Sequence, residues 1–248
     1  MELEVKDAKL HFEFSGDPKD PSLVLWNGAG CSLRMWDRVV EKLKNQFFTI
    51  TFDVRGTGLS EVKANDKSQF TFETYSEDLN KILEYLNVSN IHIWSMAWGS
   101  RAALAYSALF PEKVLSATLS DASIGIADTD SQKEGSKRAY KKQIASGVES
   151  FDLPEGWNQH LNNETMVMAL SAAKGYNFEG AVKNINCPVL IMTGDHDPNL
   201  KYSNYLEGEI SESRLVVLTD VGHGSVLQRP DLTLKEFLSF HKEKANID

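Results

Sequence analysis

Residues 91–104 read Ile91-His92-Ile93-Trp94-Ser95-Met96-Ala97-Trp98-Gly99-Ser100-Arg101-Ala102-Ala103-Leu104, and this stretch decides the fold. It opens with a β-branched, apolar run typical of a buried strand and closes with residues that favour a helix. Between the two lies a turn of small residues, with Ser95 two positions before Ala97 and Gly99 two positions after it. A strand that reverses sharply into a helix with this spacing is a nucleophile elbow, whose apex residue carries the reactive atom. The predicted apex is Ala97, which has no reactive atom.

Two other interpretations of this stretch are open. Ser95 could be the apex, but the residue two positions before it would then be the bulky Ile93, and the residue two positions after it would be Ala97 rather than glycine. Alternatively, the stretch is an ordinary strand–loop–helix connection without chemistry. The remainder of the chain decides between these interpretations.

The composition is that of an acidic, globular protein. The chain has 248 residues, 42% of them hydrophobic, which is ample for one core and predicts a single domain over residues 1–248. Its net charge of −9 argues against nucleic acid or an anionic membrane as the main partner. The two cysteines, Cys31 and Cys187, form no disulfide framework, and no Cys/His cluster has zinc spacing, so we predict neither metal nor cofactor. The sequence shows neither a signal peptide nor a membrane span, and the expected location is the cytoplasm.

Strand and helix patterns alternate along most of the chain. The expected strands are a hairpin at 2–15 and single strands at 22–26, 47–52, 90–94, 114–120, 188–192 and 215–218. The expected helices are 34–45, 73–87, 98–110 and 230–244. This order predicts an α/β fold with a mostly parallel, eight-stranded sheet and helices on both faces.

Residues 123–185 interrupt the alternation and show only helical patterns, at about 131–149, 154–173 and 177–184, which predicts a small helical cap. Lys133, Lys137 and Lys141 recur every four residues in this segment; they could attract an anionic substrate, although a solvated helix face explains them better. The candidates to line a substrate pocket are Met96, Trp157, Met166 and Met168. Plain packing against the sheet explains the three cap residues equally well.

Three residues follow predicted strands in the order Ala97, Asp197, His223. The order nucleophile, acid, histidine is that of a catalytic triad built on an elbow. The carboxyl ends of parallel strands meet at one edge of the sheet, so these residues are expected to lie together. Asp195 is the alternative acid, one residue after Gly194.

Several loops then resemble those of the α/β-hydrolase superfamily. The turn Asn27-Gly28-Ala29-Gly30 resembles its H-G-x-G oxyanion loop with Asn in place of His, and Asp53 to Ser60 matches its D-x-R-G-x-G-x-S turn, which we interpret as structural. Gly194-x-x-Asp197 and Gly222-His223 are similar to its acid and histidine loops. The run from Trp26 to Gly30 followed by Met35-Trp36-Asp37 resembles the 3-oxoadipate enol-lactonase-type carboxylic ester hydrolases, which carry a small helical cap.

This resemblance implies a role for each matching position. His223 would be the general base, Asp197 would orient its imidazole, and the backbone N–H groups of Ala29 and Trp98 would form the oxyanion hole. The implied substrate is a small ester or lactone. With Ala97 no acyl-enzyme can form, and loss of a nucleophile typically removes about 10⁶ in turnover.

Two classes of function follow. The first is a serine hydrolase of esters or lactones in an inactivated form, in which Ala97 replaces the nucleophilic serine and the protein traps bound substrate. The second is a natural, non-catalytic ligand-binding or receptor protein on the same fold. A C–C bond hydrolase or a perhydrolase would use the same triad and differ only in its substrate.

Overall fold

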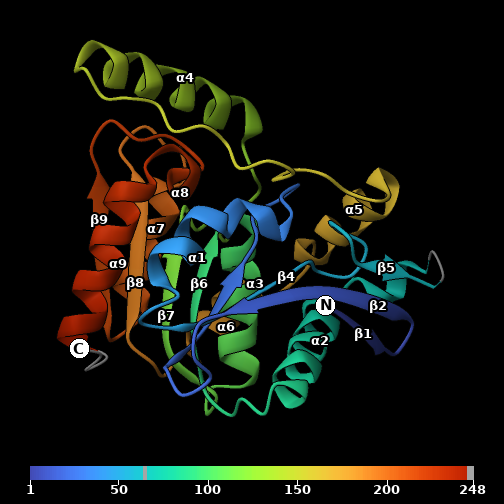
Figure 1. Ribbon diagram of the computed structural model, residues 1–248. Helices are drawn as coiled ribbons and strands as arrows, with labels where there is room; N and C mark the ends of the chain where they lie inside the picture. Colours follow the sequence, from blue (N-terminus) through green and yellow to red (C-terminus); the bar gives the residue numbers. More distant parts are fainter. Residues whose placement is uncertain (64–65, 245–248) are drawn as a thin grey trace.

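A single mixed sheet organises the computed structural model, which describes residues 1–63 and 66–244. Within these residues, eight strands run across the sheet in the order β1-β2-β4-β3-β6-β7-β8-β9 (Figure 1). The sequence predicts eight strands in a mostly parallel sheet. A further two-residue strand, β5 (Glu61–Val62), pairs with β2; it is too short for its periodicity to show in the sequence. The eight strands are β1 (Glu2–Val5), β2 (Ala8–Ser15), β3 (Ser22–Trp26), β4 (Phe48–Phe52), β6 (Ile91–Met96), β7 (Val114–Ser120), β8 (Val189–Gly194) and β9 (Ser213–Leu218).

The strands from β4 to β9 on this path are parallel, whereas β1 and β2 add an antiparallel edge. The residues of β6 and β8 are all buried, as expected for strands covered on both faces. The carboxyl ends of β3, β6, β7, β8 and β9 therefore meet at one edge of the sheet, and the loops that follow them can form a common site.

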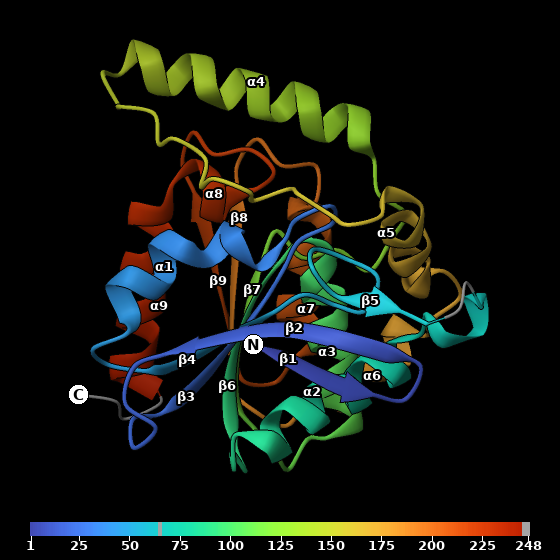
Figure 2. The same cartoon turned by 45° about the vertical axis from the view of Figure 1, so that its right-hand side comes forward.

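Helices cover both faces of the sheet. One face packs against α1 (Asp37–Leu43), α8 (Ser225–Gln228) and α9 (Pro230–Lys244), and the other against α2 (Phe72–Tyr85), α3 (Trp98–Leu109), α6 (Phe178–Val182) and α7 (Leu200–Glu209) (Figure 2). The sequence analysis missed α7, because only Ser203 and Leu206 of that helix are buried and its apolar periodicity is weak. Among the described helices, none is both long and apolar enough to cross a bilayer.

The segment 123–185 contains α4 (Thr129–Ala145), α5 (Asn163–Leu170), a short 3₁₀ turn at Ser171–Ala173, and α6. The helix predicted over 154–173 is wrong for its first half. Gly156 lies at φ +73°, and the side chain of Asn162 accepts the N–H groups of Glu164 and Thr165, so α5 begins only after Asn162. In Figure 1, α4 projects above the ends of β8 and β9, and α5 lies on the opposite side of the sheet edge.

Two buried histidines lie at the other end of the sheet. Nδ1 of His92 is 2.8 Å from the Ser116 hydroxyl, which is 3.3 Å from Nε2 of His241. Burial lowers the pKa of both imidazoles to about 4, and for His92 the charge of His241 contributes as well. Both are therefore neutral in the folded protein at neutral pH.

The buried pair His92 and His241 predicts that the folded protein loses stability in acid. An unfolded histidine binds its proton near pH 6.5, whereas the folded ones bind it near pH 4, so folding free energy is lost as the pH falls between these values. The substitution His241→Gln should reduce the loss of unfolding free energy between pH 7 and pH 5 by about 2 kcal/mol. Urea denaturation at the two pH values measures this. Equal pH dependence in both proteins would contradict the assignment.

Candidate active site

The turn between β6 and α3 has the predicted sharp geometry. Ala97 has φ 54° and ψ −109°, outside the regions that alanine normally adopts, and this confirms the expected positive φ. Its N–H donates to the Ser120 carbonyl at 2.7 Å, which fixes the turn against the end of β7. Ala97 itself is 8% exposed.

Gly99 lets α3 approach the strand beside this turn. A Cβ atom at Gly99 would lie 2.4 Å from the Asn27 carbonyl oxygen and 2.6 Å from that of Trp26. These contacts are shorter than any side chain tolerates, so only glycine allows this packing. The spacing quoted from the sequence, a small residue two positions after the apex, therefore has a direct steric cause.

Asp197 and His223 meet at the carboxyl edge of the sheet. Asp197 follows β8 and His223 follows β9, and Nδ1 of His223 lies 2.9 Å from Oδ2 of Asp197. The other carboxylate oxygen of Asp197 accepts the N–H of Asn199 at 2.9 Å. Asp195, the alternative acid, instead accepts the Val221 N–H and does not bond His223. The hydrogen bond between Asp197 and His223 is thus the one the sequence favours.

The environment of His223 stabilises its protonated form. Burial alone would lower its pKa, but the hydrogen bond that Nδ1 donates to Asp197 and the negative charges of Asp121 and Asp197 outweigh this effect and raise the pKa above 6.5. Because Nδ1 is engaged by Asp197, Nε2 is the nitrogen left for proton transfer. The side chain remains 22% exposed, so a ligand can reach it.

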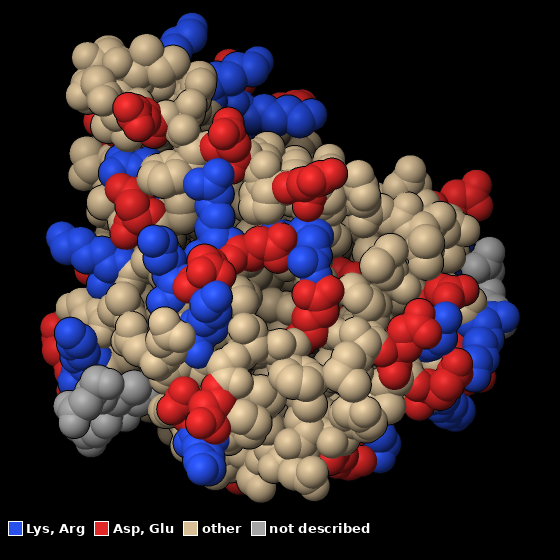
Figure 3. Space-filling model, viewed as in Figure 1, with Lys and Arg blue, Asp and Glu red and all other residues tan. Residues whose placement is uncertain are grey.

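An open cleft of about 700 Å³ lies beside His223. Its wall is formed by Ala29 and His223 on the sheet side and by one side of α4. The α4 residues that line it are Thr129, Gln132, Lys133, Ser136, Lys137 and Tyr140. Lysine and arginine side chains gather over α4, at the top of the view in Figure 3. Two of the three periodic lysines, Lys133 and Lys137, thus face the cleft.

The helix α4 is bonded to the loops that carry Asp197 and His223. The Ser136 hydroxyl donates to the His223 carbonyl at 3.1 Å, and the Gln143 amide donates to the Asp220 carbonyl at 2.6 Å. A Cβ at Gly135 would lie only 2.0 Å from the His196 carbonyl oxygen, so the helix backbone rests directly on the acid loop. These contacts hold the cleft wall in place relative to His223.

None of the four predicted pocket residues is among the residues that line this cleft. Met96 is buried, with its Cε 2.6 Å from where a Cβ of Gly28 would be, and Trp157 packs on the same core cluster. Met168 packs against the other core cluster, and Met166 is half-buried. Their contact with a substrate stays a prediction.

The two predicted oxyanion donors follow two different strands, Ala29 in the loop after β3 and Trp98 after the turn at the end of β6. Ala29 is exposed and lines the cleft next to His223. Trp98 is the first residue of α3, where the helix leaves N–H groups without intrahelical acceptors, and Ala97 provides no side-chain cap. The Trp98 indole N–H donates to the Leu170 carbonyl at 3.1 Å, so this residue also joins α3 to the end of α5.

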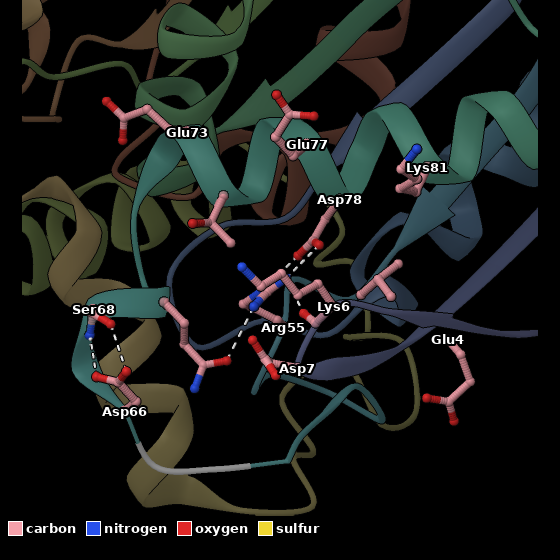
Figure 4. A pocket seen from close by; sticks show the side chains of 13 residues that line it. Glu4, Lys6, Asp7, Arg55, Asp66, Ser68, Glu73, Glu77, Asp78 and Lys81 are labelled. Carbon is pink, nitrogen blue, oxygen red and sulfur yellow. Dashed lines mark hydrogen bonds and ion pairs between the residues drawn. The ribbon is translucent and has the colours of Figure 1, made fainter.

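The turn that begins at Asp53 is structural, as predicted. Asp53 accepts the N–H groups of Leu33 and Leu59, and Arg55 donates to both carboxylate oxygens of Asp78 at 2.7 Å and 2.6 Å. Arg55 forms the floor of a larger cavity of about 890 Å³ between α2 and the β1–β2 turn (Figure 4). This cavity shares no lining residue with the cleft beside His223, and its arginine is fully engaged by protein acceptors.

Among the residues that the structure describes, two groups of side chains come close enough to share a cation, namely Asp121, Asp197 and His223, and Asp195, His196 and Asp220. In the first group, Asp197 is hydrogen-bonded to His223 and Asp121 to backbone N–H groups. In the second group, Lys142 lies 3.1 Å from Asp220. We assign a metal to neither group, and the expectation of a site without metal or cofactor stays a prediction.

Comparison with known proteins identifies the family. Residues 21–152, more than half of the chain, match the model of the alpha/beta hydrolase fold. The chain belongs to the α/β-hydrolase fold family. The resemblance inferred from its loops is therefore confirmed at the level of the family.

Two proteins similar to this chain carry the names of hydrolases. The chain is 25% identical to 3-oxoadipate enol-lactonase 1 of Acinetobacter baylyi over 94% of its own length and 93% of that protein. It is 24% identical to a putative carbamate hydrolase, RutD, of Agrobacterium fabrum over 93% and 97% of the two chains. The enol-lactonase structure from Burkholderia xenovorans superposes with a TM-score of 0.78 at 19% identity, covering 98% of this chain and 100% of the other. The fold thus matches along nearly the whole chain.

The backbone at Ala97 predicts an unusual stability effect. Alanine forced to such angles costs of order 1–3 kcal/mol, a strain that glycine does not have. The substitution Ala97→Gly should therefore raise the unfolding free energy by about 1 kcal/mol. The matched control is Ala103→Gly inside α3, which should lower it by about 1 kcal/mol or more. Urea denaturation measures both, and a loss of stability for Ala97→Gly would contradict the strained turn.

Proposed function

We propose that this chain has the architecture of a hydrolase of carboxylic esters or lactones, in which Ala97 occupies the position of the nucleophilic serine. The observation that carries the proposal is the 2.9 Å hydrogen bond between Asp197 and His223, formed at the sheet edge that also carries the strained turn at Ala97. A protein that only binds ligands has no need of a histidine held by a buried carboxylate beside an elbow turn. The hydrolase names of its relatives support the same class of chemistry.

In the proposed mechanism a serine at position 97 attacks the carbonyl carbon of the substrate. His223 takes the hydroxyl proton through Nε2 and returns it to the leaving oxygen, while Asp197 fixes the ring tautomer and stabilises the imidazolium. The N–H groups of Ala29 and Trp98 bind the oxyanion, each donor contributing about 2.7–4 kcal/mol to transition-state stabilisation. Water then hydrolyses the acyl-enzyme with the same base.

With Ala97 the attack cannot occur, so the chain as it stands is expected to bind substrate and release it unchanged. The methyl group at position 97 is itself the observation that favours the second candidate, a non-catalytic binding protein on this fold. The two candidates differ in one respect, namely whether the rest of the site is ready for catalysis once an oxygen is supplied.

The proposed substrate is small and carries a negative charge. Lys133 and Lys137 face the cleft from α4, and within the described residues Lys133 forms no ion pair, whereas Lys137 pairs with Glu134 at 2.8 Å. An ammonium group at the cleft wall attracts a carboxylate through several ångströms of solvent. One relative is named for the lactone of a dicarboxylic acid, which is chemistry of this kind.

The substitution Ala97→Ser should create hydrolytic activity. The turn directs the new hydroxyl group into the site with His223 already oriented, and this preorganisation is the larger part of catalysis. The variant should hydrolyse 4-nitrophenyl acetate or a small lactone at least about 10³-fold faster than the Ala97 protein. Because only neutral His223 accepts a proton and its pKa is raised, activity should increase with pH through a pKa above 6.5.

The control is the double variant Ala97→Ser, His223→Ala, which should lose this activity. Absorbance of released nitrophenolate and a pH-stat assay for lactones provide the readouts. An Ala97→Ser protein that is folded but inert against a broad ester and lactone panel, while the Ala97 protein binds one of these compounds, would establish the binding-protein candidate instead.

The charge of the substrate is tested with lysine variants in the Ala97→Ser background. Lys133→Met should raise KM for a carboxylate-bearing ester about 5-fold or more and leave KM for a neutral ester of equal size unchanged, because one cation at the cleft wall is lost. Lys141→Met is the matched control, since Lys141 is on the same helix but does not line the cleft. Equal effects of the two variants, or of the two esters, would exclude this role.

A further inference from the structure

Asp121 is a buried acid for which the proposed mechanism has no use. It follows β7 directly, at φ 54°, and its side chain is completely inaccessible to solvent. Oδ2 accepts the N–H of Gly224 at 3.0 Å and that of Ser225 at 2.7 Å. These are the two residues after His223, so Asp121 anchors the loop that carries the histidine to the end of β7.

The same strand end is also bonded to the acid loop. The side-chain amide of Asn199 donates to the Asp121 carbonyl at 2.9 Å, while the Asn199 backbone N–H donates to Oδ1 of Asp197 at 2.9 Å. The N–H of Asp121 itself donates to the Met192 carbonyl of β8 at 2.8 Å. Asp121 thus lies where the loops of Asp197 and His223 are joined.

Its second carboxylate oxygen is left without a partner. Within the described residues, Oδ1 of Asp121 is buried and makes no hydrogen bond, although the polar atoms of Asp121, Asp197 and His223 lie within 4.8 Å of one another. An ionised Asp121 would place a second negative charge, buried and close to that of Asp197, which is unfavourable. Burial first, and then the charge of Asp197, raises the pKa of Asp121 to about 7.

We propose that Asp121 is a positioning residue that holds the His223 loop through Gly224 and Ser225 and sets, by its own protonation state, how tightly His223 binds its proton. With Asp121 ionised, two negative charges lie next to the imidazole and the proton is held tightly. With Asp121 protonated, only Asp197 acts on it. Asp121 and His223 therefore titrate as a coupled pair.

The other charges around the imidazole are few. Arg101 of α3, whose guanidinium donates to the carbonyls of Ser123 and Gly125, opposes protonation of His223. Lys133 and Lys137 of α4 line the cleft at its exposed side. Arg101 lowers the proton affinity of the ring, whereas Asp121 and Asp197 keep it high.

The test is an NMR titration of the imidazole nitrogens of His223 in the Ala97 protein, before and after Asp121→Asn. The asparagine Oδ1 can still accept the Gly224 and Ser225 N–H groups, but the charge is gone. The pKa of His223 should fall by at least about half a unit, a threefold loss of proton affinity. Asp197→Asn should lower it further. Asp195→Asn is the matched control, because this neighbouring carboxylate is bonded to Val221 instead, and it should leave the pKa unchanged.

An unchanged His223 titration in folded Asp121→Asn protein would overturn the proposal. Should that variant fail to fold, the carboxyl ¹³C resonance of Asp121 in the unaltered protein decides. Titration near neutral pH, with a matching inflection in the His223 resonances, supports the coupling, whereas titration below about pH 5 with no such inflection overturns it. The consequence for activity rests on the proposed function, but these measurements require no turnover, so failure of Ala97→Ser to hydrolyse esters would not affect them.

Discussion

The site depends on one close approach between backbones, that of α3 and the end of β3 at Gly99. Since the carbonyls of Trp26 and Asn27 occupy the space of a side chain, α3 lies directly against the sheet and the chain must reverse within a single residue. That residue, Ala97, takes a positive φ and projects from the sheet edge. Without this approach the turn would relax, and position 97 would lose the positive φ that defines the elbow.

The parallel sheet brings the other groups to the same edge. Asp121, Asp197 and His223 each follow a neighbouring strand, and hydrogen bonds through Asn199, Gly224 and Ser225 tie their loops together. The helix α4 forms one wall of the cleft and donates hydrogen bonds to two carbonyls of the loop after β9, those of Asp220 and His223. Hydrogen bonds hold the histidine and its carboxylate in a fixed orientation, which is the condition under which such a pair is effective. The arrangement also buries a second carboxyl group, that of Asp121, whose Oδ2 accepts two backbone N–H groups while its Oδ1 has no partner among the described residues.

Much of this arrangement could be predicted from the sequence. The elbow, the acid Asp197 and the histidine were recognisable because each is a small or polar residue in the loop that follows a predicted strand, and the order of strands then brings these loops to one edge. The cap was harder. Its helix over 154–173 was predicted from apolar residues alone, and Gly156 and the cap formed by Asn162 override that pattern. The cleft-facing side of α4 could not be distinguished from a solvated one, because the orientation of Lys133 depends on contacts at Gly135 and Ser136 with loops far away in sequence.

Asp121 carried the same signal as Asp197, a carboxylate at a strand end, but only the tertiary structure shows that it accepts the N–H groups next to His223.

The central claim is that position 97, His223 and the N–H groups of Ala29 and Trp98 converge on one reacting carbonyl. The most direct measurement is a crystal structure of the Ala97→Ser variant after treatment with a 4-nitrophenyl phosphonate, with the covalent adduct first detected as a mass increase of the intact protein. The account predicts a phosphonyl group on residue 97, with its oxygen bound by the N–H groups of Ala29 and Trp98 and His223 adjacent to the serine oxygen. Absence of an adduct in a folded variant, or an adduct whose oxygen points away from both N–H groups, would contradict it.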